Sequence, residues 1–82
     1  MPFSGTLGQQ NVAEKIMELI VNGEVKKVPS PMSVEGLLNF LELDSVKIAV
    51  ELNLEIVSRS TYAQTDLKDQ DRLEIVHFVG GG

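Results

Sequence analysis

Residues 73–82, the last ten of the chain, join an apolar run to three consecutive glycines. Leucine, isoleucine, valine and phenylalanine dominate the run, and this composition is typical of a β-strand. Glycine has no side chain to pack and loses more conformational entropy than other residues when it is ordered. The chain must therefore fold so that a buried strand leads directly into a bare tail, which we expect to be flexible and to comprise Gly80, Gly81 and Gly82. We interpret the residues upstream as a scaffold that presents this tail.

Two interpretations of the three glycines are open. A tail without side chains is narrow enough to enter a channel into the active site of another protein, where bulkier residues would not pass. A flexible linker or a cloning remnant has a similar composition. The direct junction of strand and tail favours the first interpretation, because ordinary chain ends fray with a mixed polar composition.

The composition narrows the classes of protein to which the chain can belong. Its 82 residues are enough for one small domain. There is no cysteine, which excludes disulfides, thiolate metal sites and a cysteine nucleophile. A formal net charge of −5 argues against binding of nucleic acid, because no stripe of Lys and Arg can neutralise phosphates. The same charge favours a partner with a basic docking face.

The hydropathy pattern predicts no contact with a membrane. The uncharged apolar runs are only a few residues long, whereas a helix that crosses a bilayer needs about 20 apolar residues. The first residues lack the basic start and apolar middle of a secretory signal, and we expect a cytoplasmic protein. Residues 1–15 contain Gly, Gln and Ser without periodicity. They are predicted to form a flexible extension, either a native arm or an expression leader.

The folded domain is predicted to span residues 16–79 and to begin with a β-hairpin. Two strand-like runs, residues 16–21 and 24–28, flank Asn22-Gly23. This dipeptide is the strongest short hairpin signal, because both of its residues tolerate positive φ. The prolines that follow end the second strand, since proline cannot donate a hydrogen bond to the ladder.

A helix is predicted over residues 34–42. Ser33 stands at the N-cap position, and Glu35 in the first turn complements the helix dipole. Gly36 lowers helix stability by about 1 kcal/mol relative to alanine, and we interpret it as a place where the helix lies close to a strand. Four apolar residues recur at helical spacing and predict one stripe that packs against a sheet: Val34, Leu37, Leu38 and Leu41.

The second half of the domain is predicted to add strands to the sheet. Residues 46–52 alternate as in a half-buried strand, and residues 56–57 form a short apolar pair. Residues 58–68 are irregular and polar, and we expect Tyr62 and Leu67 to anchor them. The residues predicted to share one face of the first strand are Val46, Ile48, Val50 and Leu52.

This order of elements predicts an α+β fold, in which a mixed sheet packs on one main helix. A turn at residues 69–71 leads into the last strand. The core is predicted to be built mainly from residues of the helix stripe and the inward faces of the strands: Leu19, Val34, Leu37, Leu38, Leu41, Ile48, Val50, Leu73 and Ile75.

A docking patch is predicted beside the tail. Leu73 and Ile75 share the inner face of the last strand, so Val76 and Phe78 belong on or near the opposite face, which an open sheet leaves uncovered. Exposed apolar groups at such a place suit contact with a partner. We predict Val76, Phe78 and Val79 as partner-binding residues.

No catalytic, metal-binding or cofactor-binding residue is predicted. His77 has no Ser or Cys nucleophile arranged around it, so a structural or docking role is favoured over general-base catalysis. Glu51 and Glu55 are interpreted as polar positions at a strand end rather than as an acid/base pair. Three aspartates lack the spacing of an EF-hand loop and are interpreted as a solvated acidic turn, with docking to a basic partner as the second interpretation: Asp66, Asp69 and Asp71.

Residues 16–82 resemble the ThiS family, the ubiquitin-like sulfur carriers of thiamine biosynthesis. The resemblance rests on the Asn-Gly hairpin, the single helix and the ending Glu-Ile-Val-His-Phe-Val-Gly-Gly-Gly. Gln70 departs from the family, which usually has glycine at this position of the turn, and residues 1–15 have no counterpart. Further residues that match the family precede the last strand: Arg59, Ser60, Tyr62, Thr65, Leu67 and Asp71.

The resemblance implies a β-grasp fold and a protein without catalysis of its own. An adenylating, E1-like enzyme of the ThiF type would use ATP to activate the carboxylate of Gly82. A sulfur donor such as a cysteine desulfurase would then convert the adenylate to a thiocarboxylate, and the sulfur would pass to a thiazole synthase of the ThiG type. The absence of cysteine agrees with this scheme, because sulfur cannot be carried as a side-chain persulfide.

Two alternative functions stay open at this point. The small subunit of molybdopterin synthase has the same fold and the same use of its tail, but delivers sulfur to a pterin. The second alternative is a β-grasp domain that only binds other proteins, in which the three glycines have no function of their own. The Glu-Ile-Val-His-Phe-Val context and the triple glycine favour the carrier of thiamine biosynthesis.

Overall fold

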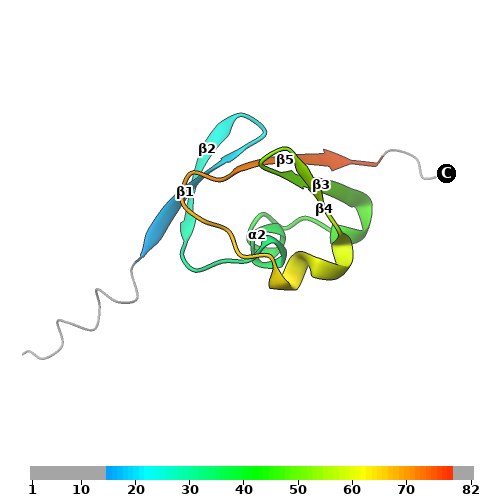
Figure 1. Ribbon diagram of the computed structural model, residues 1–82, viewed down its shortest axis with the longest axis horizontal. Coiled ribbons are helices and arrows are strands. Elements are labelled where there is room, and N and C mark those ends of the chain that lie inside the picture. The colour runs from blue at the N-terminus through cyan, green and yellow to red at the C-terminus, as the bar shows by residue number, and fades with distance from the viewer. Residues whose placement is uncertain (1–14, 79–82) are drawn as a thin grey trace, which may run out of the picture.

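The computed structural model describes residues 15–78, which contain five β-strands, one α-helix and two 3-10 helices (Figure 1). The predicted flexible segments, residues 1–15 and 80–82, fall outside the described residues except for Lys15, as does Val79. The strand order in the sheet is β2-β1-β5-β3-β4. The last strand in the sequence is therefore the central strand of the sheet.

The predicted hairpin is confirmed. Strand β1 (Ile16–Val21) pairs antiparallel with β2 (Glu24–Pro29) along its whole length. Asn22 and Gly23 form the turn with φ values of 52° and 83°, as a two-residue hairpin turn of this hand requires. Strand β2 runs one residue further than predicted, because an edge strand tolerates the missing N–H of Pro29.

Helix α2 (Val34–Phe40) begins where the sequence predicts and ends earlier. The Gly36 N–H donates to Oγ of Ser33 at 3.0 Å, which confirms the N-cap. Glu42 has a φ of 61°, and the N–H groups of Glu42 and Leu43 donate to the carbonyls of Asn39 and Leu38. This left-handed cap ends the helix at Phe40 instead of residue 42.

The interpretation of Gly36 as a point of close approach to a strand is wrong. A Cβ atom on Gly36 would lie 3.3 Å from Cγ of Met32 and 3.5 Å from Oγ of Ser33. The glycine therefore makes room for the segment that enters the helix and for its cap.

Strand β3 (Ile48–Leu52) is shorter than the predicted strand over residues 46–52. Residues Ser45–Lys47 form the 3-10 helix η1, which begins with a hydrogen bond from the Val46 N–H to Oδ1 of Asp44 at 3.0 Å. The side chain of Val46 is 60% exposed and does not share the buried face of Ile48. The alternation of apolar and polar residues does not show where a 3-10 turn ends and the following strand begins.

The rest of the domain closes over one end of the core. Strand β4 (Glu55–Val57) pairs antiparallel with β3, and the 3-10 helix η2 (Arg59–Gln64) lies within the segment predicted to be irregular. Tyr62 and Leu67 are buried, which confirms them as anchors of this segment. Strand β5 (Arg72–His77) then enters the middle of the sheet.

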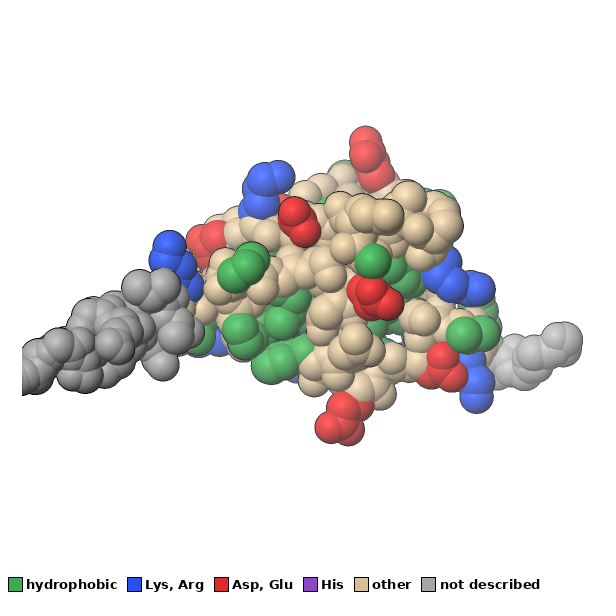
Figure 2. All heavy atoms as spheres, turned by 90° about the horizontal axis from the view of Figure 1, so that it is seen from below, with side chains coloured by type: hydrophobic (Ala, Val, Ile, Leu, Met, Phe, Trp, Pro, Cys, Tyr) green, Lys and Arg blue, Asp and Glu red, His purple; other side chains and the backbone are tan. Residues whose placement is uncertain are grey.

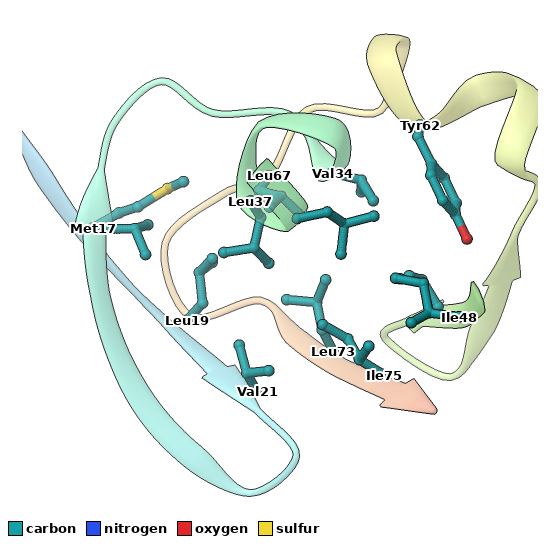
Figure 3. Close-up of a cluster of buried hydrophobic side chains, with 13 residues drawn as sticks. Met17, Leu19, Val21, Val34, Leu37, Ile48, Tyr62, Leu67, Leu73 and Ile75 are labelled. Atoms are coloured by element: carbon teal, nitrogen blue, oxygen red, sulfur yellow. The ribbon is translucent and has the colours of Figure 1, made fainter. Parts of the chain in front are cut away.

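Strand β5 is parallel to β1 and antiparallel to β3, and helix α2 lies across one face of this mixed sheet (Figure 1). The predicted core is confirmed, except that Leu41 is only partly buried. Figure 3 shows side chains from strands, helix and η2 pointing toward one interior. The buried side chains are Met17, Leu19, Val21, Val28, Val34, Leu37, Leu38, Ile48, Val50, Tyr62, Leu67, Leu73 and Ile75.

Helix α2 provides a matched test of this core. Leu38 is 1% exposed, whereas Phe40 on the same helix is 50% exposed. We expect Leu38→Ala to lower the free energy of unfolding by about 2–5 kcal/mol, and Phe40→Ala to change it by less than about 0.5 kcal/mol. Urea unfolding followed by circular dichroism measures both, and equal effects would contradict the packing described here.

The turn before β5 provides a second test. Gln70 has a φ of 74°, so a side chain occupies a left-handed position that favours glycine. We expect Gln70→Gly to raise the free energy of unfolding by about 0.5–1 kcal/mol, with a corresponding rise in Tm. Gln70→Ala removes the same polar group but keeps the strain, so it should give no such gain. Equal Tm values for the two variants would show that the left-handed backbone conformation at position 70 does not destabilise the domain.

Candidate functional site

The candidate site is the end of β5, where the chain leaves the centre of the sheet. Because β5 is parallel to β1, it ends at the side of the sheet opposite to the start of β1 (Figure 1). Its last described backbone hydrogen bond runs from the Phe78 N–H to the carbonyl of Lys47 at 2.9 Å. The predicted attachment residue, Gly82, and its neighbours Gly80 and Gly81 follow in sequence and lie outside the described residues.

Val76 and Phe78 are exposed at this end of the strand, as predicted. Their side chains are 57% and 58% exposed, whereas Leu73 and Ile75 on the same strand are buried. Val76 is opposite Ala49 in the ladder with β3. The outer side of β5 and the residue after it therefore present apolar groups near the glycines in the sequence, and their role in binding a partner stays a prediction.

Two carboxylates lie on the same outer face. Glu74 is directly opposite Glu51 in the β3–β5 ladder, and Ile56 on β4 is opposite Glu51 on its other side. Ile56 is 79% exposed. Like charges in directly opposite positions destabilise a sheet, and a basic group of a partner would relieve this repulsion. Glu55 opens β4 and is also exposed.

His77 lies on the helix side of the sheet, at the rim of a hollow of about 350 Å³. The lining of this hollow includes Ile75 from β5, Leu41 and Leu43 after helix α2, and Lys26 from β2. Nζ of Lys26 is 3.7 Å from Oε1 of Glu24, so its charge is already paired. The described residues that line the hollow include no serine, threonine or cysteine that His77 would activate.

The aspartates near β5 act as hydrogen-bond acceptors. Oδ1 of Asp69 accepts from the Glu18 N–H at 2.8 Å, and Oδ2 of Asp71 accepts from the Lys68 N–H at 2.8 Å. Asp66 forms an isolated bridge with Ser33. No group of three or more His, Cys, Asp or Glu residues within residues 15–78 is arranged to hold a metal ion.

The surface of the helix side is mixed in charge. Figure 2 shows acidic side chains spread between hydrophobic ones, and the Lys and Arg side chains of the described residues form no continuous stripe on this face. Within the same residues, no helix has the length and apolar character needed to cross a bilayer.

Asn22 is a residue of the site that sequence reasoning missed. Its side chain bonds the backbone of β5: the Ile75 N–H donates to Oδ1 of Asn22 at 2.7 Å, and Nδ2 of Asn22 donates to the Ile75 carbonyl at 3.1 Å. The Asn-Gly dipeptide indicates the turn but not these bonds, because Ile75 is 53 positions away in the sequence. Asn53 similarly bonds the start of β5, where its Oδ1 accepts from the Arg72 N–H at 3.0 Å.

A mixed five-stranded sheet with one helix across it, whose central strand leads to the C-terminal residues, defines a ubiquitin-like β-grasp domain. A crystal structure of the thiamine biosynthesis protein ThiS from Geobacter metallireducens has this arrangement. It is 36% identical, with a TM-score of 0.71, and the match covers 80% of this chain and all of that one. The model of the ThiS family matches residues 11–82, and the chain belongs to this family.

Relatives of two lengths match the chain. The sulfur carrier protein ThiS of Bacillus subtilis is 40% identical over 65 residues, which are 78% of this chain and 98% of that protein. The thiazole synthase of Paramagnetospirillum magneticum is 54% identical over 66 residues, 80% of this chain but 20% of that protein. The chain therefore spans about a fifth of the length of this longer relative.

Proposed function

We propose that the chain is a sulfur carrier of thiamine biosynthesis and acts as a protein co-substrate rather than as a catalyst. The observation that carries the proposal is the exit of the central strand β5 into a glycine tail. Membership of the ThiS family and the likeness to a carrier over 98% of its length support it. Sulfur would be carried on the carboxylate of Gly82 as a thiocarboxylate.

The chemistry of this step depends on activation of a carboxylate. A carboxylate is a poor electrophile, so an E1-like, ThiF-type enzyme would transfer AMP from ATP to an oxygen of the Gly82 carboxylate and release pyrophosphate. A sulfur donor, for example the persulfide of a cysteine desulfurase, would then attack the carbonyl carbon and release AMP. A thiol would reduce the resulting acyl disulfide to the thiocarboxylate and release the donor. The chain contributes its terminus and no bound cofactor. We propose that the reaction takes place in the cytoplasm.

The acceptor of the sulfur is proposed to be a ThiG-type thiazole synthase. In the relatives from Paramagnetospirillum magneticum and Magnetococcus marinus, the segment similar to this chain is part of a protein named thiazole synthase. A carrier and its acceptor enzyme that share one polypeptide are expected to act in successive steps. These relatives favour the thiamine pathway over transfer to a pterin.

The outer face of the sheet is the proposed docking surface for these partners. Val76 and Phe78 offer apolar contact beside the tail, and the Glu51–Glu74 pair favours a basic group on the partner. Val79 is also proposed as a partner-binding residue, because it follows Phe78 in the sequence.

The tail is tested by changes that leave the folded domain intact. We expect loss of sulfur loading on deletion of Gly82, on addition of one residue after it, and in Gly81→Val. An added residue moves the carboxylate by about 3.5 Å, and the valine side chain obstructs the channel. Intact-protein mass after incubation with the activating enzyme, ATP and a sulfur donor measures loading, with the modified peptide then mapped. Wild type that gains no sulfur, or loading that persists without Gly82, would refute the proposal.

The docking surface is tested with a matched pair of exposed aromatic residues. Phe78 and Phe40 are 58% and 50% exposed, but only Phe78 follows β5. We expect Phe78→Ala to raise the Kd for the activating enzyme by about tenfold or more, while Phe40→Ala leaves it unchanged. Calorimetric titration measures both, with Tm as the control for folding. Wild-type affinity in the Phe78 variant would show that the partner binds elsewhere.

A further inference from the structure

Strand β5 loses one of its two neighbours before it ends. On the β1 side, the Ile20 N–H donates a hydrogen bond to the Asp71 carbonyl, and the Asn22 N–H donates one to the Leu73 carbonyl, both at 2.9 Å. The chain then turns back at Asn22-Gly23 into β2, so β1 offers no backbone partner to Ile75. On its other edge, β5 stays paired with β3 as far as His77.

The side chain of Asn22 takes the place of the missing strand residue. Its Oδ1 accepts from the Ile75 N–H at 2.7 Å and its Nδ2 donates to the Ile75 carbonyl at 3.1 Å. A carboxamide presents an acceptor oxygen beside a donor nitrogen, and here one N–H of that nitrogen and the oxygen are used as a peptide unit of a neighbouring strand would use its own. The hydrogen-bond ladder between β1 and β5 is therefore extended by one position through a side chain instead of the backbone of a strand.

Packing supports Ile75, whose side chain is part of the core, but gives less support to the residues that follow it. The hollow of about 350 Å³ lies under Ile75 and His77 on the helix side. On the outer side, the side chains of Val76 and Phe78 are more than half exposed. Without the bonds from Asn22, the β5 backbone from Ile75 onward would be hydrogen-bonded along the β3 edge alone.

We propose that Asn22 is a positioning residue for the reaction of the tail. Its carboxamide holds the end of β5 in one direction, and so sets both the place of the docking groups Val76 and Phe78 and the line along which the glycines leave the domain. This inference rests on the proposed function. Fixing the end of β5 lowers the entropic cost of bringing the carboxylate of Gly82 to ATP in the activating enzyme.

The chain contains a matched control for Asn22. Asn53 has nearly the same backbone conformation, with a φ of 50° against 52°. It too makes two side-chain hydrogen bonds near β5, to the Arg72 N–H and to Oδ1 of Asp71, both at 3.0 Å. Asn53 acts at the start of β5, however, and Asn22 acts toward its exit.

The experiment compares Asn22→Gly with Asn53→Gly. Glycine accepts a φ near 50°, so each turn is kept while two hydrogen bonds are lost. We expect urea unfolding to show a loss of stability in both variants, larger for Asn22→Gly because its hydrogen bonds are partly buried. In ATP–pyrophosphate exchange with the activating enzyme, we expect kcat/KM to fall at least about tenfold for Asn22→Gly and less than about twofold for Asn53→Gly. Assays are run at a temperature at which both variants are folded.

Two further readouts separate positioning from stability. The Ile75 amide should exchange its hydrogen faster in Asn22→Gly than in Asn53→Gly, by more than the difference in their stabilities accounts for. Asn22→Asp keeps the acceptor for the Ile75 N–H but sets a carboxylate oxygen against the Ile75 carbonyl, so its kcat/KM should fall at least as far as that of Asn22→Gly.

The outcomes distinguish this inference from the function on which it rests. Wild type that is never adenylated would refute the proposed function and the inference with it. Wild type that is adenylated normally, with equal losses of kcat/KM in the two glycine variants, would refute the positioning role alone. Unchanged exchange of the Ile75 amide in Asn22→Gly would do the same, because the hydrogen bond would then be absent.

Discussion

The pairing of β5 on both of its edges is the interaction on which the rest of the fold depends. Strands β1 and β5 are parallel, and parallel neighbours cannot be joined by a tight turn. The helix, both 3-10 helices and β3–β4 are therefore placed in the connection between them, where they cover and extend the sheet. The strand that closes the sheet is also the strand that leads to the tail, so stability of the fold and placement of the tail depend on the same backbone.

The side chains of β5 alternate between the two faces of the sheet, so some of them pack in the core and others stay available for docking. Leu73 and Ile75 are buried against the helix side and contribute to stability, whereas Val76 and the following Phe78 are exposed. Because successive side chains of a strand point to opposite faces, the docking groups can change without disturbing the core. This separation suits a carrier that is proposed to meet an activating enzyme and an acceptor enzyme with one small surface.

The outer face of the sheet carries one feature that lowers stability and one that leaves apolar surface exposed to water. Glu51 and Glu74 face each other across the ladder, and the apolar side chain of Ile56 beside them is 79% exposed. Opposite like charges cost a few tenths to about 1 kcal/mol in a sheet. Both features become favourable when a surface with basic and apolar groups covers them, which agrees with the proposed docking face.

The sequence by itself determined the features that arise from neighbouring residues. Asn22-Gly23 specifies the hairpin, Ser33 the start of the helix, and alternation the burial of Leu73 and Ile75. The strand order and the bonds of Asn22 to Ile75 were decided by the tertiary structure, because they join segments that no local pattern connects; Asn22 and Ile75 are 53 positions apart. Tertiary packing also overrode local preference in the left-handed conformations at Glu42 and Gln70, which ordinary side chains disfavour in isolation.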